Sequence, residues 1–121
     1  MVTLVLIFFH WVSDFLMQSD YTAKNKSSNN YILLDHVMKY SLLFLGFFGW
    51  QFALVNAVAH FITDYFTSRW TKKLWEAGNT HYFFVVVGFD QFFHVATLLI
   101  SYHILAEYEM IDLFLIQLNL I

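Results

Sequence analysis

Apolar residues fill four long stretches of the chain, and short polar segments separate them. Residues 40–59 carry no charged side chain, and residues 82–106 carry a single one, Asp90. A helix that crosses the hydrocarbon core of a bilayer needs about 20 mostly apolar residues. The pattern therefore predicts an all-α, polytopic membrane protein with four transmembrane helices, at about 2–18, 31–48, 51–70 and 81–106.

The segments between these helices read as one loop, one turn and one terminal piece. Residues 19–30, SDYTAKNKSSNN, form the expected loop, and Gly46 and Gly49 favour a tight turn before the third helix. Residues from about 107 to 121 are too short to span a bilayer, so we expect them to lie in the membrane interface or against a partner. A soluble helical bundle is the alternative, but these uncharged runs are longer than a normal amphipathic stripe.

Composition agrees with the membrane assignment. Of the 121 residues, 60% are apolar and 12% are charged, compared with roughly 25% charged in typical soluble proteins. The length suits one membrane-embedded helical domain, 1–121. A net charge of −3 argues against nucleic acid as a partner.

The basic residues predict an orientation. Lys24 and Lys26 follow the first predicted helix, and Arg69, Lys72 and Lys73 follow the third. Loops on the cytoplasmic side carry an excess of lysine and arginine. We therefore expect both basic loops in the cytoplasm, both termini outside, and a multi-pass protein of the bacterial inner membrane.

Each predicted helix also carries histidine or aspartate, at estimated depths of about 6 to 20 Å below the cytoplasmic surface. A charged side chain in hydrocarbon costs at least about 2.5–3.5 kcal/mol, so these residues should face one another rather than lipid. Residues four apart share a helix face. The pairs with this spacing are His10 with Asp14, His36 with Tyr40, His60 with Asp64, and Asp90 with His94.

Imidazoles and carboxylates together are the ligands of a borderline divalent metal. Zinc takes four such ligands, or three and a water where it is catalytic, and iron, manganese or nickel also suit this set. The residues could fill one site, with outer carboxylates orienting the histidines, or two adjacent sites. The candidate metal ligands are His10, Asp14, His36, His60, Asp64, Asp90 and His94.

Two other interpretations of this cluster remain open. Pairs of histidine and aspartate also serve as interhelical hydrogen-bonding groups in membrane bundles. Chains of the same residues form proton or ion paths. Asn56, one turn from His60, would fit any of the three interpretations.

Two segments fifty residues apart share one pattern: HWVSDF at 10–15 and HFITDY at 60–65. Each is followed by a basic loop and then by a helix with another aspartate and histidine. We therefore predict two tandem helical hairpins, at about 1–48 and 51–106, related by an axis along the membrane normal. Parallel repeats of this kind place functional groups at their interface.

The same segments resemble a known family. HWVSDFLMQSDYTAKNK, LLDHVMKY, NAVAHFITDYFTSRWTKKLWEAG and HYFFVVVGFDQFFH look like the small bacterial and phage membrane proteins of domain of unknown function 3307, over residues 10 to about 103. The resemblance implies a small multi-helix membrane protein, often phage-borne, and brings no established activity. As a motif-level analogy, the His/Asp set is also similar to those of membrane-bound metal-dependent hydrolases and alkaline ceramidases.

Two functions follow from these observations. The first is a metal-dependent hydrolase, with zinc as the expected metal and Asp14 or Asp64 as general base, acting on a lipid or lipid-linked substrate from the cytoplasmic leaflet. The second is a non-enzymatic phage membrane protein, either an ion- or proton-conducting homo-oligomer or a binder of host membrane proteins.

Overall fold

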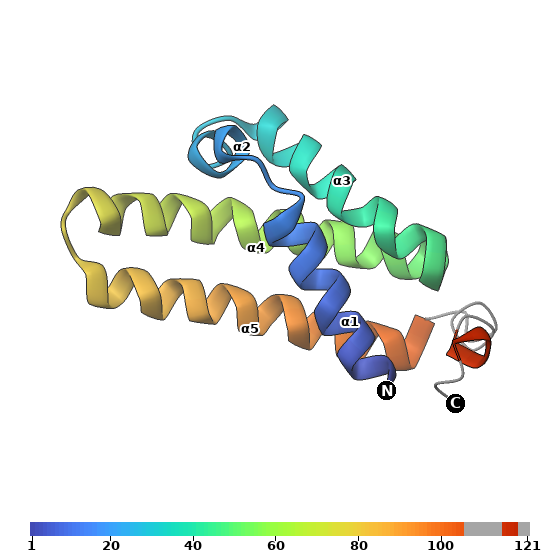
Figure 1. Cartoon of the computed structure of the whole chain (residues 1–121). Helices are drawn as coiled ribbons and strands as arrows, with labels where there is room; N and C mark the ends of the chain where they lie inside the picture. The colour runs from blue at the N-terminus through green and yellow to red at the C-terminus, as the bar shows by residue number, and fades with distance from the viewer. Residues whose placement is uncertain (106–114, 119–121) are drawn as a thin grey trace.

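The chain is all-α in the computed structural model, which describes residues 1–105 and 115–118. A first helix, α1, passes directly into a π-helical turn, η1, and four further helices follow (Figure 1). Their bounds are α1 Val2–Trp11, η1 Val12–Leu16, α2 Asp20–Asn25, α3 Asn30–Phe48, α4 Trp50–Glu76 and α5 Thr80–Leu105.

The four long helical segments agree with the predicted ones, with two differences. Helix α4 continues six residues beyond the predicted end at residue 70. The predicted loop at 19–30 contains the short helix α2, so the prediction was wrong there. The predicted C-terminal segment lies outside the described residues apart from 115–118.

Short-range hydrogen bonds and two glycines set the ends of these helices. The side chains of Ser19 and Asn29 accept hydrogen bonds from backbone N–H groups at the starts of α2 and α3. Gly49, with φ of 84°, separates α3 from α4, and Gly78, with φ of 70°, lies in the turn before α5. Positive φ is costly for residues with a Cβ, so glycine allows both turns to be tight.

Helices α4 and α5 form a long antiparallel hairpin, α1 and α3 pack against it, and α2 packs on α3 (Figure 1). Helix α3 packs on α4, and α1 contacts both α5 and α3. Aromatic side chains on α3 and α4 fill the centre of this arrangement. Those with at most 1% of their surface exposed are Tyr40, Phe44, Phe48 and Phe52.

The two basic segments lie at the same end of the bundle. Helix α2 and the turn between α4 and α5 occupy one end, whereas the N-terminus and the turn at Gly49 lie toward the other (Figure 1). The predicted orientation requires both basic segments to lie at one end of the bundle. The direction of the bundle in a bilayer stays a prediction.

Two helices of the described part, α3 and α5, are long and apolar enough to cross a membrane. The segment Val2–Leu16 is apolar but shorter, and polar side chains lower the mean hydropathy of α4. A core helix of a soluble protein can pass the same test, so length and composition support membrane association without establishing four spans.

The polar and the apolar residues of α4 lie on opposite sides of the helix. Asn56, His60, Asp64 and Thr67 are buried inside the bundle. On the outside, large apolar side chains recur every four residues, and each is more than half exposed. This apolar stripe of α4 consists of Leu54, Val58, Ile62, Phe66 and Trp70.

Cysteine labelling tests the arrangement of the two ends, because the chain has no native cysteine. Single substitutions Ser28→Cys and Ala77→Cys lie at the basic end, and Gln51→Cys lies at the opposite end; all three positions are exposed. In intact bacteria, we expect a membrane-impermeant maleimide to label only Gln51→Cys. The other two should react after permeabilisation. Equal labelling of all three in intact cells would contradict the predicted topology.

Candidate metal centre

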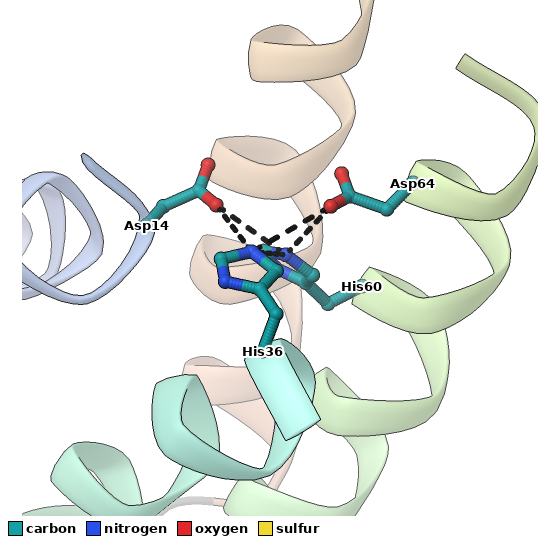
Figure 2. A group of neighbouring side chains, drawn as sticks. All are labelled: Asp14, His36, His60 and Asp64. Atoms are coloured by element: carbon teal, nitrogen blue, oxygen red, sulfur yellow. Dashed lines mark hydrogen bonds and ion pairs between the residues drawn. The ribbon is translucent and has the colours of Figure 1, made fainter. Parts of the chain in front are cut away.

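Four buried side chains converge from three elements of the bundle. Asp14 comes from η1, His36 from α3, and His60 and Asp64 from successive turns of α4 (Figure 2). The two imidazole rings lie together, with one carboxylate on each side (Figure 2). None of the four residues is more than 4% exposed. The group therefore lies in the interior, where charge must be compensated.

The four donor atoms are separated by distances typical of ligands around one small metal ion. The His36 Nε2 atom lies 3.0 Å from Asp14 Oδ1, 3.2 Å from His60 Nε2 and 3.6 Å from Asp64 Oδ2. The His60 Nε2 atom lies 3.4 Å from each of the same two carboxylate oxygens. Zinc binds nitrogen and oxygen at about 2.0–2.1 Å, which places tetrahedral ligands about 3.3–3.4 Å apart. These residues could therefore hold a metal ion.

A lysine compensates part of the charge of this group. Lys26, at the C-terminal end of α2, places its Nζ atom 2.6 Å from Asp64 Oδ2, and only 14% of its side chain is exposed. One ammonium group balances one carboxylate. A divalent cation among the four donors would balance both Asp14 and Asp64, which is the charge that a metal ion supplies.

Helix α5 holds the outer oxygens of the two carboxylates. Gln91 Nε2 donates to Asp14 Oδ2 at 3.2 Å and to Asp90 Oδ2 at 3.0 Å. His94 Nε2 lies 3.2 Å from Asp64 Oδ1. One oxygen of each of these two carboxylates thus faces the other donor atoms of the group of four. A side chain of α5 fixes the other oxygen. Outer hydrogen bonds of this kind orient the ligands of metal sites.

A second group of possible ligands adjoins the first. Asp64, Asp90 and His94 each offer a donor atom within 4.8 Å of the others. His94 Nε2 lies 3.6 Å from Asp90 Oδ2, and Thr67 donates its hydroxyl to the other oxygen of Asp90. Because Asp64 Oδ1 faces this group and Asp64 Oδ2 faces the first, the carboxylate has the arrangement of a bridge between two positions.

His10 lies beside the four donors rather than among them. The Gln91 amide nitrogen faces two carboxylates, so its Oε1 atom must face His10, which donates from Nε2 at 2.9 Å. The other ring nitrogen of His10 then accepts from the Tyr40 hydroxyl at 3.4 Å. The Tyr40 ring also packs on His60, with 4.1 Å between ring centroids. His10 and Tyr40 therefore contact the group of four donors and its hydrogen-bond partners without belonging to the group.

All seven predicted metal-binding residues lie in this one connected polar network. Asp14, His36, His60 and Asp64 form the central group, Asp90 and His94 extend it, and His10 borders it. Their role as ligands stays a prediction. The proposed repeat predicts matching roles for His10 and His60, but the structure gives these two histidines different surroundings.

Asn56 does not belong to the network. It donates to the backbone oxygen of Phe52 and to the Ser101 hydroxyl at 2.8 Å, and so joins α4 to α5 at a different level. His81 is exposed at the start of α5.

Sequence reasoning missed Gln91, Thr67 and the role of Lys26. Gln91 stands between Asp90 and His94 in an apolar helix, and a polar side chain at that position was an available signal. The sequence predicts Lys26 in a basic loop. Nothing in the sequence indicated that α2 would carry its ammonium group back to Asp64.

A π-helical turn places Asp14. The Met17 backbone N–H donates to the Val12 oxygen at 2.9 Å, five residues earlier, and the Ser13 hydroxyl donates to the Phe9 oxygen at 2.7 Å. This wider turn changes the angle at which Asp14 leaves the helix axis. Single π turns inside helices occur frequently at functional sites.

Lys26 and a metal ion would compete for the same oxygen of Asp64. We therefore expect Lys26→Met to bind Zn²⁺ about tenfold more tightly than the parent, because a hydrogen bond between charged groups contributes about 1.5–3 kcal/mol. Competition with a chromophoric chelator measures the affinity of the detergent-purified protein. Lys39→Met, at an exposed ion pair with Asp35, is the control and should bind like the parent. Equal or weaker affinity of Lys26→Met would contradict the competition.

Comparison with known proteins identifies a family but no activity. A family model described as protein of unknown function (DUF3307) matches residues 2–120. A search of the curated proteins and a search of the solved structures find no match. Since the family model covers nearly the whole sequence, the chain belongs to the DUF3307 family of proteins of unknown function.

Proposed function

We propose that this protein is a membrane-embedded, metal-dependent hydrolase that acts on a lipid or lipid-linked substrate. The observation that carries the proposal is the set of four donor atoms from Asp14, His36, His60 and Asp64. The two imidazole nitrogens lie 3.0 to 3.6 Å from each other and from the two carboxylate oxygens. Zinc suits these ligands and these distances.

The distribution of apolar surface supports the membrane part of the proposal. The apolar stripe of α4 faces outward, whereas the polar residues of the same helix face inward. Helix α1 and η1 likewise expose Leu4, Phe8, Trp11 and Phe15. Large exposed apolar surfaces mark membrane or protein contacts. Four helices with polar interiors and apolar exteriors fit a bundle surrounded by lipid.

A metal centre that catalyses hydrolysis needs an open position. The four central donors would complete a tetrahedral site, which is typical of a closed, structural position. The second group supplies three donors and leaves a place for water or substrate. Asp64 and Asp90 of this group line a cavity of about 600 Å³, so the open position would face it.

Hydrolysis requires little more than this arrangement. A bound metal ion would polarise a carbonyl or phosphoryl group and lower the pKa of water toward about 7. The oxygen of water forms a bond to the carbonyl carbon or to phosphorus. The bond from that atom to the leaving-group oxygen breaks, and the leaving-group oxygen takes the proton that the water releases. No further reactant is consumed.

The contacts of the predicted general bases favour a holding role for both. Asp14 is held by His36 and Gln91, and Asp64 by Lys26 and His94. Because both oxygens of each carboxylate already have partners, we assign them to binding and orienting. Asp90 also lines the cavity, but its two oxygens accept from Thr67 and Gln91, so it has the same kind of holding contacts.

Ion conduction has less support. The polar network meets the buried aromatic layer beyond Tyr40, where Phe44, Phe48 and Phe52 have no exposed surface. Among the described residues, therefore, the network does not continue directly along the bundle. Binding of a host membrane protein would use the exposed apolar faces, and nothing in the described surface specifies such a partner.

Metal analysis tests the proposal. We expect detergent-purified protein to hold stoichiometric zinc by mass spectrometry, and His60→Ala and Asp64→Ala to lose it because each removes a central donor. Asn56→Ala is the matched control, since Asn56 is a buried polar residue of the same helix outside the network. Substoichiometric metal in the parent, unchanged in the variants, would rule out the metal centre.

The same measurement separates one bound ion from two. If both groups are filled, Asp90→Asn should reduce the content from two equivalents to one. Hydrolysis is then followed with mixed micelles that contain a fluorogenic ester lipid or a fluorogenic phosphate lipid. A metal-loaded parent inactive on both, with a metal content that Asp90→Asn does not change, would indicate a structural metal instead.

A further inference from the structure

The cavity beside the centre is lined in part by lysines that the sequence predicts in the two basic loops. Its volume is about 600 Å³, and its walls come from η1, the region of α2, the end of α4 and the first half of α5. Lys24, Lys26 and Lys72 are among the residues that line it. Asp14 and Asp64 reach it from the centre, so the cavity joins the centre to the basic end of the bundle.

Part of the remaining wall of the cavity is apolar. Phe15 comes from η1, Trp75 from the end of α4, and Phe83 and Val87 from α5. Lysine is a point-charge partner for phosphate, whereas apolar and aromatic side chains favour hydrocarbon. A ligand that suits both surfaces carries an anionic phosphate group and an apolar chain.

The charge of the cavity depends on the centre. Three lysines face four carboxylates, those of Asp14, Asp64, Asp90 and Glu76, so the cavity has a net negative charge when no metal is bound. One divalent cation makes the net charge positive. Binding of that cation to Asp64 also releases the Lys26 ammonium group, whose side chain already lies on the cavity wall.

We propose that this cavity binds the phosphate group of a phosphorylated lipid, and that it does so when the centre holds its metal. The proposal rests on the proposed function, because the metal supplies the positive charge. Lys24, Lys26 and Lys72 contact the phosphate, and the aromatic wall contacts the start of the acyl chain. The cavity lies at the basic end of the bundle, which is the expected level of lipid head groups.

The test compares two double variants with the same change in charge. Lys24→Gln with Lys72→Gln removes two lysines of the cavity. Lys39→Gln with Lys73→Gln removes two exposed lysines outside it. Calorimetry measures binding of dioctanoyl phosphatidic acid, dioctanoyl phosphatidylcholine and inorganic phosphate to the full chain in detergent, with zinc and after chelation. Zinc content is measured in every sample.

We expect zinc-loaded parent protein to bind phosphatidic acid, and chelated protein to bind it at least tenfold more weakly. The cavity variant should keep its zinc and lose at least tenfold in affinity for phosphatidic acid, while the control variant binds like the parent. Phosphatidylcholine and inorganic phosphate should both bind more weakly than phosphatidic acid.

Three results would overturn the inference in distinguishable ways. A cavity variant that keeps zinc and binds phosphatidic acid like the parent would remove the lysines from recognition and leave the metal centre intact. Inorganic phosphate that binds as tightly as phosphatidic acid would assign the cavity to free phosphate. A parent protein that holds no metal would refute the proposed function and this inference together.

Discussion

Two carboxylates buried on either side of one pair of imidazoles are the constraint on which the rest of the structure depends. Asp14 and Asp64 approach the same pair of imidazole nitrogens, with almost no exposure to solvent. Removing one compensating partner from a buried charge costs about 3–5 kcal/mol, so the fold must supply positive charge or donors to both. Lys26, Gln91 and His94 do this in the described structure. A divalent cation would do so more completely.

The arrangement of the helices follows from that constraint. The π turn carries Asp14 inward, α3 brings His36, and the hairpin of α4 and α5 brings the remaining donors with their hydrogen-bond partners. Polar residues gather inside while the outer surfaces remain apolar, which is the opposite of a soluble bundle. The cavity of about 600 Å³ lies beside the centre and toward the basic end. The proposed metal binding and the proposed phosphate binding thus depend on one set of contacts.

Much of this could be predicted from the sequence, and the reasons are local. Long apolar runs predicted the four long helices, and spacing by four placed His60 and Asp64 on one face, where the structure has them. The cost of buried charge predicted that the polar faces would meet. The π turn at Val12–Leu16, the helix around Lys24 and the inward path of Lys26 could not be predicted, because tertiary contacts determine them. The motif shared by the segments around His10 and His60 predicts equal roles for these two histidines. The structure differs, because the Nε2 atom of His10 hydrogen-bonds to Gln91.

X-ray absorption spectroscopy at the zinc edge tests the central claim most directly, because it reports which atoms surround the metal in the purified protein. The account predicts nitrogen and oxygen ligands at about 2.0–2.1 Å, with outer-shell scattering from two imidazole rings, those of His36 and His60. In His36→Ala, the imidazole contribution should fall or the zinc should be lost. A shell of oxygen alone, with no imidazole scattering and no response to His36→Ala, would contradict the account.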